Sequence, residues 1–202
     1  MMPMDSHHLE CDVLVAGGGP AGVACAIAAA RCGAKVVLCQ DRPVLGGNAS
    51  SEVRMHVVGA DRSGKRGAAL QTEAREGGII EEVRLEGSVG NPQRSASMLD
   101  LTLFEKVRAE PNITLLLNTS VTAAITRGDR IVSCQAERAS TEESFTICAR
   151  VFVDCTGDGR LGAEAWDEYD RPVAPGNRHF GQDALDRRRD NLDLYIGGLR
   201  FL

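Results

Sequence analysis

The chain has 202 residues, of which 43% are hydrophobic and 25% are charged, as in ordinary soluble globular proteins. This length is enough for one domain with its own core, or for one domain with an appendage. Acidic residues outnumber basic ones by 28 to 23, and the net charge of −5 argues against a protein-wide basic field. We therefore expect no nucleic-acid partner.

The first residues, the apolar runs and the cysteines of the chain bear on its expected cellular location and metal content. The first ten residues contain no long apolar run, so we expect no secretory signal, and the longest small apolar run, residues 23–30, is too short to cross a bilayer. Seven cysteines, an odd number without a CxxC pair, argue against a disulfide scaffold and against a zinc or iron–sulfur cluster. We expect reduced thiols, no metal site, no membrane contact and a cytoplasmic location.

A strand, a glycine-rich turn, a helix and a second strand follow one another in the first forty residues. Residues 12–16 and 35–39 are short apolar runs rich in β-branched side chains. Residues 21–31 between them are rich in alanine, with Pro20 suited to the first helical turn and Gly33 to the end. This pattern predicts a βαβ unit with parallel strands.

The following residues predict helices, a meander and one more buried strand. Helical spacing occurs at residues 66–79 and 97–109, and an apolar strand follows at residues 113–117. Three alternating runs predict an antiparallel β-meander, at residues 121–125, 130–137 and 144–149. Residues 151–154 predict a last buried strand. The fold class is therefore α/β and Rossmann-like, with a parallel sheet, an inserted helical segment and an antiparallel β-meander.

The composition of the chain changes near Ala165. Five of the eight aromatic residues lie in the last 37 positions, whereas every cysteine lies before Thr156. We place the main domain at residues 1–165, with a helical insert at about 46–110, and an atypical tail at residues 166–202.

The first glycine-rich turn has the GxGxxG spacing of dinucleotide-binding folds, at Gly17, Gly19 and Gly22. The first glycine permits a tight turn, the second lets a pyrophosphate approach the backbone, and the third lets the helix pack on the sheet. The helix begins with Pro20 and Ala21, where free N–H groups and the helix dipole favour phosphate. The alternative is a glycine-rich turn without a ligand.

An acidic residue is expected about 20 positions further on, to bind ribose hydroxyls at the end of the second strand. Gln40 has that place, with Asp41 next to it. The sequence leaves open which of the two makes the contact, and Asp41 has the alternative of a solvated turn residue.

Two further turns return to the same edge of the predicted sheet. In the second, which spans residues 45–51, Gly47 allows close approach to a ligand and Asn48 offers a donor and an acceptor. In the third, which spans residues 156–159, Asp158 can accept hydrogen bonds from ribose or ribityl hydroxyls. The alternative role for Asp158 is a helix N-cap.

Catalytic candidates follow the second turn. Arg54 can hold an acidic group and His56 can move a proton. The alternative for both is a polar loop that packs under the insert.

Five stretches in this order resemble the FAD-dependent oxidoreductases related to the A-type flavin subunit of heterodisulfide reductases. Within residues 11–165 they read DVLVAGGGPAG, RPVLGGNASSEVR, GGIIEEVRLEGSVGNPQ, DLTLFEKVRAEPNITLLLNTSV and FVDCTGDG. The resemblance implies a glutathione-reductase-like FAD fold and FAD as the cofactor. Iron–sulfur clusters enter only by association with the family, because no cluster motif is present here.

The resemblance also implies roles for single residues. Gly17, Gly19 and Gly22 hold the pyrophosphate, and Gln40 takes the adenosine-ribose position, where the family usually has Glu. The remaining implied contacts are Arg42 near the adenine, Gly47 and Asn48 near the flavin end, the backbone of Val121 at the adenine, and Thr156, Gly157 and Asp158 in a second FAD-contact motif.

The function we expect is an FAD-dependent oxidoreductase, or its N-terminal FAD-binding portion. It transfers a hydride or two electrons between FAD and an unidentified small-molecule substrate or electron-transfer partner. The alternatives are a nicotinamide-binding Rossmann dehydrogenase and a non-catalytic truncated remnant. The tail suggests a truncated or frame-shifted gene product, with a short tail that folds back or pairs with a partner as the alternative.

Overall fold

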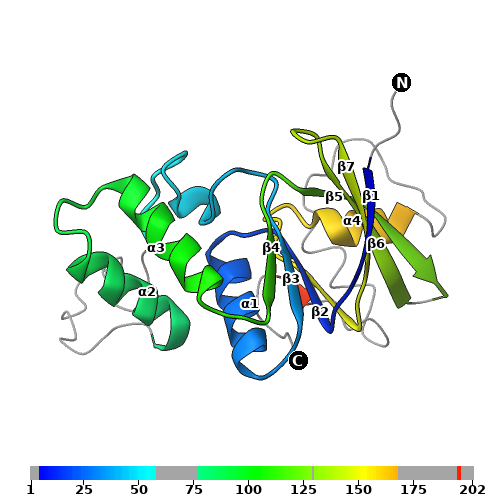
Figure 1. The fold of residues 1–202 in the computed structure, drawn as a ribbon, viewed down its shortest axis with the longest axis horizontal. Helices are drawn as coiled ribbons and strands as arrows, with labels where there is room; N and C mark the ends of the chain where they lie inside the picture. Colours follow the sequence, from blue (N-terminus) through cyan, green and yellow to red (C-terminus); the bar gives the residue numbers. More distant parts are fainter. Residues whose placement is uncertain (1–4, 58–76, 129, 168–194, 197–202) are drawn as a thin grey trace, which may run out of the picture.

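The computed structural model describes residues 5–57, 77–128, 130–167 and 195–196, which form two β-sheets flanked by α-helices (Figure 1). The helices α1, α2 and α3 lie to one side of the parallel strands in this view, and the second sheet lies to the other side with α4. This layering is the one expected when a parallel sheet must be covered on both faces.

The first sheet is parallel throughout, with the strand order β4-β3-β2-β8-β9. Its strands are β2 (Val13–Ala16), β3 (Val36–Cys39), β4 (Ile113–Leu116), β8 (Val151–Asp154) and β9 (Tyr195–Ile196). Helix α1 (Pro20–Arg31) connects β2 to β3. The βαβ unit predicted from the sequence is therefore confirmed.

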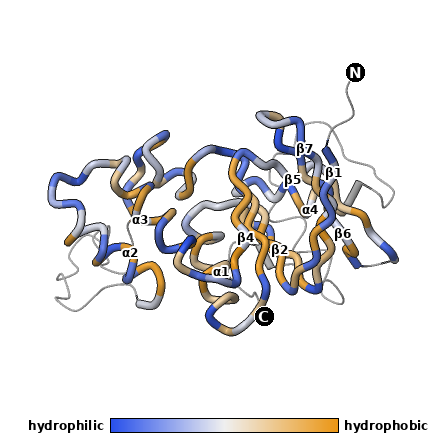
Figure 2. The backbone as a smooth tube through the Cα atoms, in the orientation of Figure 1, coloured by the Kyte–Doolittle hydropathy of each residue, from blue (hydrophilic) through white to orange (hydrophobic). Residues whose placement is uncertain are grey.

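Strands β2 and β3 are apolar at every position because both faces of the sheet are buried there. Along β2, Leu14 faces one hydrophobic core and Val15 the other. Along β3, Val37 joins the first core and Leu38 the second. Figure 2 shows hydrophobic residues concentrated in these central strands. A strand buried on both faces has no polar alternation, so its continuous apolar run is the expected pattern.

The second sheet has the order β1-β7-β6-β5. Strands β5 (Ser120–Arg127), β6 (Arg130–Arg138) and β7 (Glu143–Cys148) pair antiparallel, which confirms the predicted meander. The fourth strand, β1 (Asp5–Glu10), pairs parallel with β7 and was not predicted. Five of its six residues are exposed, so it lacks a hydrophobic period, and backbone pairing with a stacking contact between His7 and Phe145 holds it in place.

Between β3 and β4 the chain forms the short helix η1 (Gly47–Ala49) and the helices α2 (Gly78–Val89) and α3 (Ala96–Arg108). Helix α3 matches the predicted helix at residues 97–109. The predicted helix at residues 66–79 falls largely outside the described residues, and α2 begins near its end. The Arg31 side chain ties α1 to this insert through Glu82, at 2.8 Å, and through Glu110, at 2.7 Å.

Helix α4 (Arg160–Asp167) follows β8 and runs past the boundary predicted near residue 165. Most of the predicted tail, residues 168–194 and 197–202, lies outside the described residues, so the domain boundaries remain a prediction. Within the described portion, no helix is both long enough and apolar enough to cross a membrane.

The stability of the fold depends on the core beside α1, and a matched pair of leucines tests this. Leu38 is 0% exposed whereas Leu101 on α3 is 42% exposed. We expect Leu38→Ala to lower the free energy of unfolding by about 2–5 kcal/mol, because it leaves a cavity. Leu101→Ala serves as the control and should cost under about 1 kcal/mol. Urea denaturation measures both, and equal losses would contradict the assigned core.

Acid should weaken the second sheet through Glu143. Its carboxylate accepts hydrogen bonds from Thr141 and, at 2.9 Å, from Arg138, and these bonds hold its pKa below the ordinary value of 4.5. Because the folded pKa is depressed, this carboxylate stabilises the fold above about pH 4.5, and the contribution is lost as the pH falls through the folded pKa.

We expect the urea midpoint of the wild type to exceed that of Glu143→Gln at pH 7, and the difference to shrink toward pH 3. Glu137→Gln, a change at an exposed acid on β6, is the control. A difference that does not vary with pH would contradict this assignment.

Candidate functional site

The strands that carry the three glycine-rich turns end at one level of the parallel sheet. Ala16, the last residue of β2, pairs with Cys39 at the end of β3 and with Asp154 at the end of β8. The residues that follow, Gly17, Gln40 and Cys155, therefore open the three turns at the same carboxyl edge. Open α/β sheets bind their ligands at this edge.

The first turn packs too closely for side chains at two of its glycines. Gly17 has a φ of +99°, and a Cβ there would lie 2.4 Å from the carbonyl oxygen of Cys155 in the third turn. A Cβ at Gly22 would lie 1.8 Å from the carbonyl oxygen of Gly17. The first and third glycines of the motif are thus required by contact between backbones.

The N-terminus of α1 presents free N–H groups at this edge. Pro20 occupies the first helical turn, and Gly19 is the N-cap without any side-chain hydrogen bond. Among the described residues, no acceptor pairs with the N–H groups of Gly19, Ala21 or Gly22, and a Cβ at Gly19 would meet nothing within 4 Å. Unpaired N–H groups beside open space are what an anionic pyrophosphate requires.

The second turn is fixed against the first. The N–H of Gly46 donates to the carbonyl oxygen of Gly18 at 2.8 Å, and a Cβ at Gly47 would lie 3.2 Å from the Cα of Gly19. Asn48 is exposed, so its amide is free to meet a ligand. The turn is anchored from α3, because the buried carboxylate of Asp100 accepts the Ser51 N–H at 2.9 Å.

The third turn is organised by Asp154, which is 2% exposed. Its carboxylate accepts hydrogen bonds from the Thr156 hydroxyl at 2.7 Å and from the Gly162 N–H at 3.0 Å. Thr156 in turn accepts the Arg160 N–H at 2.9 Å and so caps α4. Asp158 is exposed, and Thr156 and Asp154 accept N–H groups of the first turn of α4 in its place.

Gln40 is 4% exposed, and both ends of its amide bind protein groups. Its Oε1 accepts the Gly18 N–H at 2.6 Å, and its Nε2 donates to the Val44 carbonyl oxygen at 3.2 Å. Asp41, one residue further on, is exposed. Both residues lie at the predicted edge, and the ribose contact stays a prediction.

The two residues expected near an adenine come from different parts of this edge. The Arg42 side chain is 57% exposed and lies 3.3 Å from Glu52, the residue that follows the second turn. Val121 lies in β5, is 7% exposed and pairs with Ala136 beside a register shift in the ladder. Its contact through the backbone remains a prediction.

The catalytic candidates follow the second turn and are both exposed. Arg54 adopts a φ of 66°, unusual for a residue other than glycine, and its Nε donates to the Ser51 carbonyl oxygen at 3.1 Å. Such backbone strain concentrates at functional sites. His56 lies two residues further on, next to Val57, the last described residue of this segment.

Two half-buried thiols, Cys25 and Cys155, lie beside the turns. Burial raises the pKa of Cys155 to about 12 and also raises that of Cys25 on α1. A raised pKa lowers the population of the thiolate, which is the nucleophilic form of cysteine. All seven cysteines are free, and no group of three potential metal ligands occurs among the described residues.

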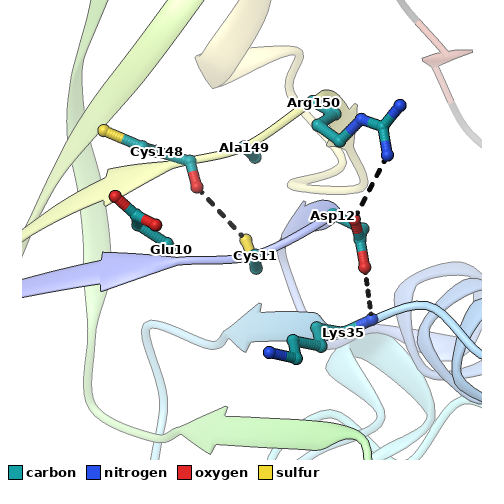
Figure 3. Close-up of a pocket in the computed structure, with 7 residues that line it drawn as sticks. All are labelled: Glu10, Cys11, Asp12, Lys35, Cys148, Ala149 and Arg150. Carbon is teal, nitrogen blue, oxygen red and sulfur yellow. Dashed lines mark hydrogen bonds and ion pairs between the residues drawn. The ribbon is translucent and has the colours of Figure 1, made fainter.

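A shallow pocket of about 390 Å³ lies at the other end of the parallel strands (Figure 3). Asp12 there accepts the Lys35 N–H at 2.9 Å and lies 3.7 Å from Arg150. The Cys11 thiol points to the Cys148 carbonyl oxygen. None of the predicted site residues lines this pocket.

Sequence reasoning missed two buried carboxylates, Asp100 and Asp154, which shape the second and third turns. Asp154 ends an apolar strand, VFVD, and a carboxylate in that place was the available signal. Asp100 carried no comparable signal, because its helix contains other polar residues.

Comparison with known proteins places this geometry in a family. The model of the FAD-dependent oxidoreductase family matches residues 12–175. The chain is 44% identical over 57 residues to the alpha subunit of sarcosine oxidase from Corynebacterium sp. (strain U-96), a match covering 28% of this chain and 6% of that protein. The chain therefore corresponds to a small part of that relative's length.

Solved structures share the fold at low identity. THI4 from Thermovibrio ammonificans is 17% identical with a TM-score of 0.55, over 82% of this chain and 65% of that one. A geranylgeranyl bacteriochlorophyll reductase-like protein from Thermoplasma acidophilum is 17% identical with a TM-score of 0.54, over 78% and 42% of the two chains.

Two Gly→Ala substitutions in helices distinguish the close packing of the first turn from the general effect of glycine on helix stability. We expect Gly22→Ala to lower the free energy of unfolding by about 3 kcal/mol or more, because its Cβ collides with backbone. In Gly87→Ala on α2, the new Cβ would lie 3.6 Å from Leu99, an ordinary contact, and we expect stabilisation of up to about 1 kcal/mol. Urea denaturation measures both, and a neutral Gly22→Ala would contradict the close packing.

Proposed function

This chain belongs to the family of FAD-dependent oxidoreductases, and on that premise we propose that its three converging turns hold FAD for a two-electron oxidation–reduction. The observation that carries the proposal is the set of N–H groups at the start of α1 that no acceptor in the described part of the chain binds, beside the open space at Gly19. We propose this activity both for the chain by itself and for a longer protein of which it is a portion.

Each turn has a separate task in this proposal. The N–H groups of Gly19, Ala21 and Gly22 bind the pyrophosphate, with Gly17 and Pro20 shaping the turn. Gly47 and Asn48 lie toward the flavin end. Thr156, Gly157 and Asp158 meet the chain of hydroxyl groups between ring and phosphate, and a Cβ at Gly157 would meet nothing within 4 Å.

FAD, when bound, supplies the redox chemistry, and the protein orients it and the substrate. Arg54 is exposed and carries a charge that can bind an anionic substrate group. His56, also exposed, can give or take a proton. We assign these two roles as proposals.

The finer family relation is also a proposal. The motifs in residues 11–165 support kinship with the A-type flavin subunit of heterodisulfide reductases, and iron–sulfur clusters enter only by that association. The name of the curated relative describes one subunit, which supports a partner protein or electron carrier for this chain. Seven free cysteines support a cytoplasmic location.

A nicotinamide dehydrogenase was the alternative, and the family match favours FAD over it. A non-catalytic remnant is the other alternative. It differs from the proposal in one measurable property, which is stable FAD binding by the purified chain.

The direct test is titration of the purified chain with FAD, followed by visible absorbance and by flavin fluorescence. We expect one FAD per chain. We expect Asp158→Ala to weaken FAD binding about tenfold, since a hydrogen bond to a charged group contributes about 1.5–3 kcal/mol. Asp5→Ala, at an exposed acid on β1, is the control and should bind FAD as the wild type does.

The unfolding midpoint of each apo variant separates loss of the site from loss of the fold. A folded chain that takes up no FAD would overturn the proposed function and support the remnant. Equal FAD affinity in Asp158→Ala and in the wild type would remove Asp158 from the site.

A further inference from the structure

We propose that Gln40 is a positioning residue that holds the first two turns together, and that Asp41 accepts the hydrogen bonds of the adenosine ribose hydroxyls. This inference rests on the proposed FAD site. It decides between two residues that the sequence leaves as equal candidates, and it departs from the position of the acid in the family pattern.

The side chain of Gln40 joins two turns. Its Oε1 accepts the Gly18 N–H of the first turn at 2.6 Å, and its Nε2 donates to the Val44 carbonyl oxygen, next to the second turn, at 3.2 Å. A Cβ at Gly18 would lie 3.1 Å from the Cβ of Gln40, so the two residues are in close contact. The amide therefore sets the distance between the two turns.

The main chain of Gln40 is equally committed. Its N–H donates to Leu116 of β4 at 2.9 Å, and its carbonyl oxygen accepts the Thr119 N–H at 2.8 Å. With 4% of the residue exposed, the unused hydrogen and lone pair of the amide have little access to a ligand. Gln40 is thus held on four sides by protein groups.

The contact with Val44 explains why an amide occupies this position. A carbonyl oxygen requires a donor, and an ionised Glu has none. A carboxylate here would place a negative oxygen against the Val44 carbonyl while keeping the bond from Gly18. Glutamine satisfies both partners at once, which a glutamate at the family's ribose position does not.

Asp41 has the properties that Gln40 lacks. It follows Gln40 directly, so it stays at the carboxyl edge of β3, and it is exposed. No donor among the described residues binds its carboxylate, and the neighbouring Arg42 lies 3.3 Å from Glu52. An ionised carboxylate has lone pairs for two hydroxyl donors, as a ribose diol requires.

The test compares ligands that differ by one hydroxyl. ADP, 2′-deoxy-ADP and 3′-deoxy-ADP compete with FAD for the purified chain and for the variants Asp41→Ala, Gln40→Ala and Gln40→Glu, with Asp5→Ala as the control. The readout is the dissociation constant of each competitor. The dissociation constant of each deoxy-ADP divided by that of ADP reports the ribose contact alone. The unfolding midpoint of each apo variant is measured in parallel.

We expect the wild type and Asp5→Ala to prefer ADP over at least one deoxy-ADP about tenfold, and Asp41→Ala to reduce this ratio to about one. Both Gln40 variants should bind FAD more weakly while keeping the wild-type ratio, since a shifted turn weakens the pyrophosphate contact and leaves the ribose contact in place. Because Asp41 is exposed, its variant decides the ribose assignment even if Gln40→Ala does not fold.

A Gln40→Glu variant that binds FAD more tightly with a larger ratio would overturn the inference, since it would show position 40 facing the ribose. An unchanged ratio in Asp41→Ala would also overturn it. Failure of the wild type to bind FAD would instead overturn the proposed function together with the inference, so the two failures are distinguishable.

Discussion

The contact between Gly22 and the carbonyl oxygen of Gly17 is the constraint on which the rest of the site depends. A Cβ at Gly22 would stand 1.8 Å from that oxygen, so α1 begins closer to the end of β2 than any side chain allows. This approach leaves the first N–H groups of the helix at the carboxyl edge of the sheet, where their partial positive charge is not cancelled by protein acceptors among the described residues. The backbone alone thus supplies the positive partial charge that the proposed pyrophosphate contact requires.

The other two turns reach this edge because the parallel sheet is buried on both faces. Its strands are registered by hydrogen bonds, so β2, β3 and β8 end together. The core that includes Val15 and Leu38 fixes one face against α1, and the core that includes Leu14 and Phe152 fixes the other against the second sheet. A shift of one residue in β8 would exchange Phe152 and Val153 between these cores, so packing specifies the register. The position of the third turn is therefore a consequence of core packing.

Strands buried on both faces could be predicted from the sequence, whereas an exposed edge strand could not. Strands β3 and β8 were predictable because double burial makes them continuous apolar runs between glycine and polar turns. Strand β1 was not, because it pairs through its backbone at an edge and leaves polar side chains exposed. In the site, GxGxxG located the first turn. The roles of Asp154 and Gln40 required contacts with Gly162 and Val44 that exist only in the folded chain.

The thiols near this edge bear on how electrons travel through the protein. Cys155 starts the third turn and contacts the first, so its position alone would suit a dithiol relay with a flavin. Burial raises its pKa to about 12, however, and burial also raises the pKa of nearby Cys25. Thiol–disulfide exchange needs a thiolate, whose population at neutral pH is minute for such a group. The partial burial of both residues therefore favours a packing role for them over a dithiol relay.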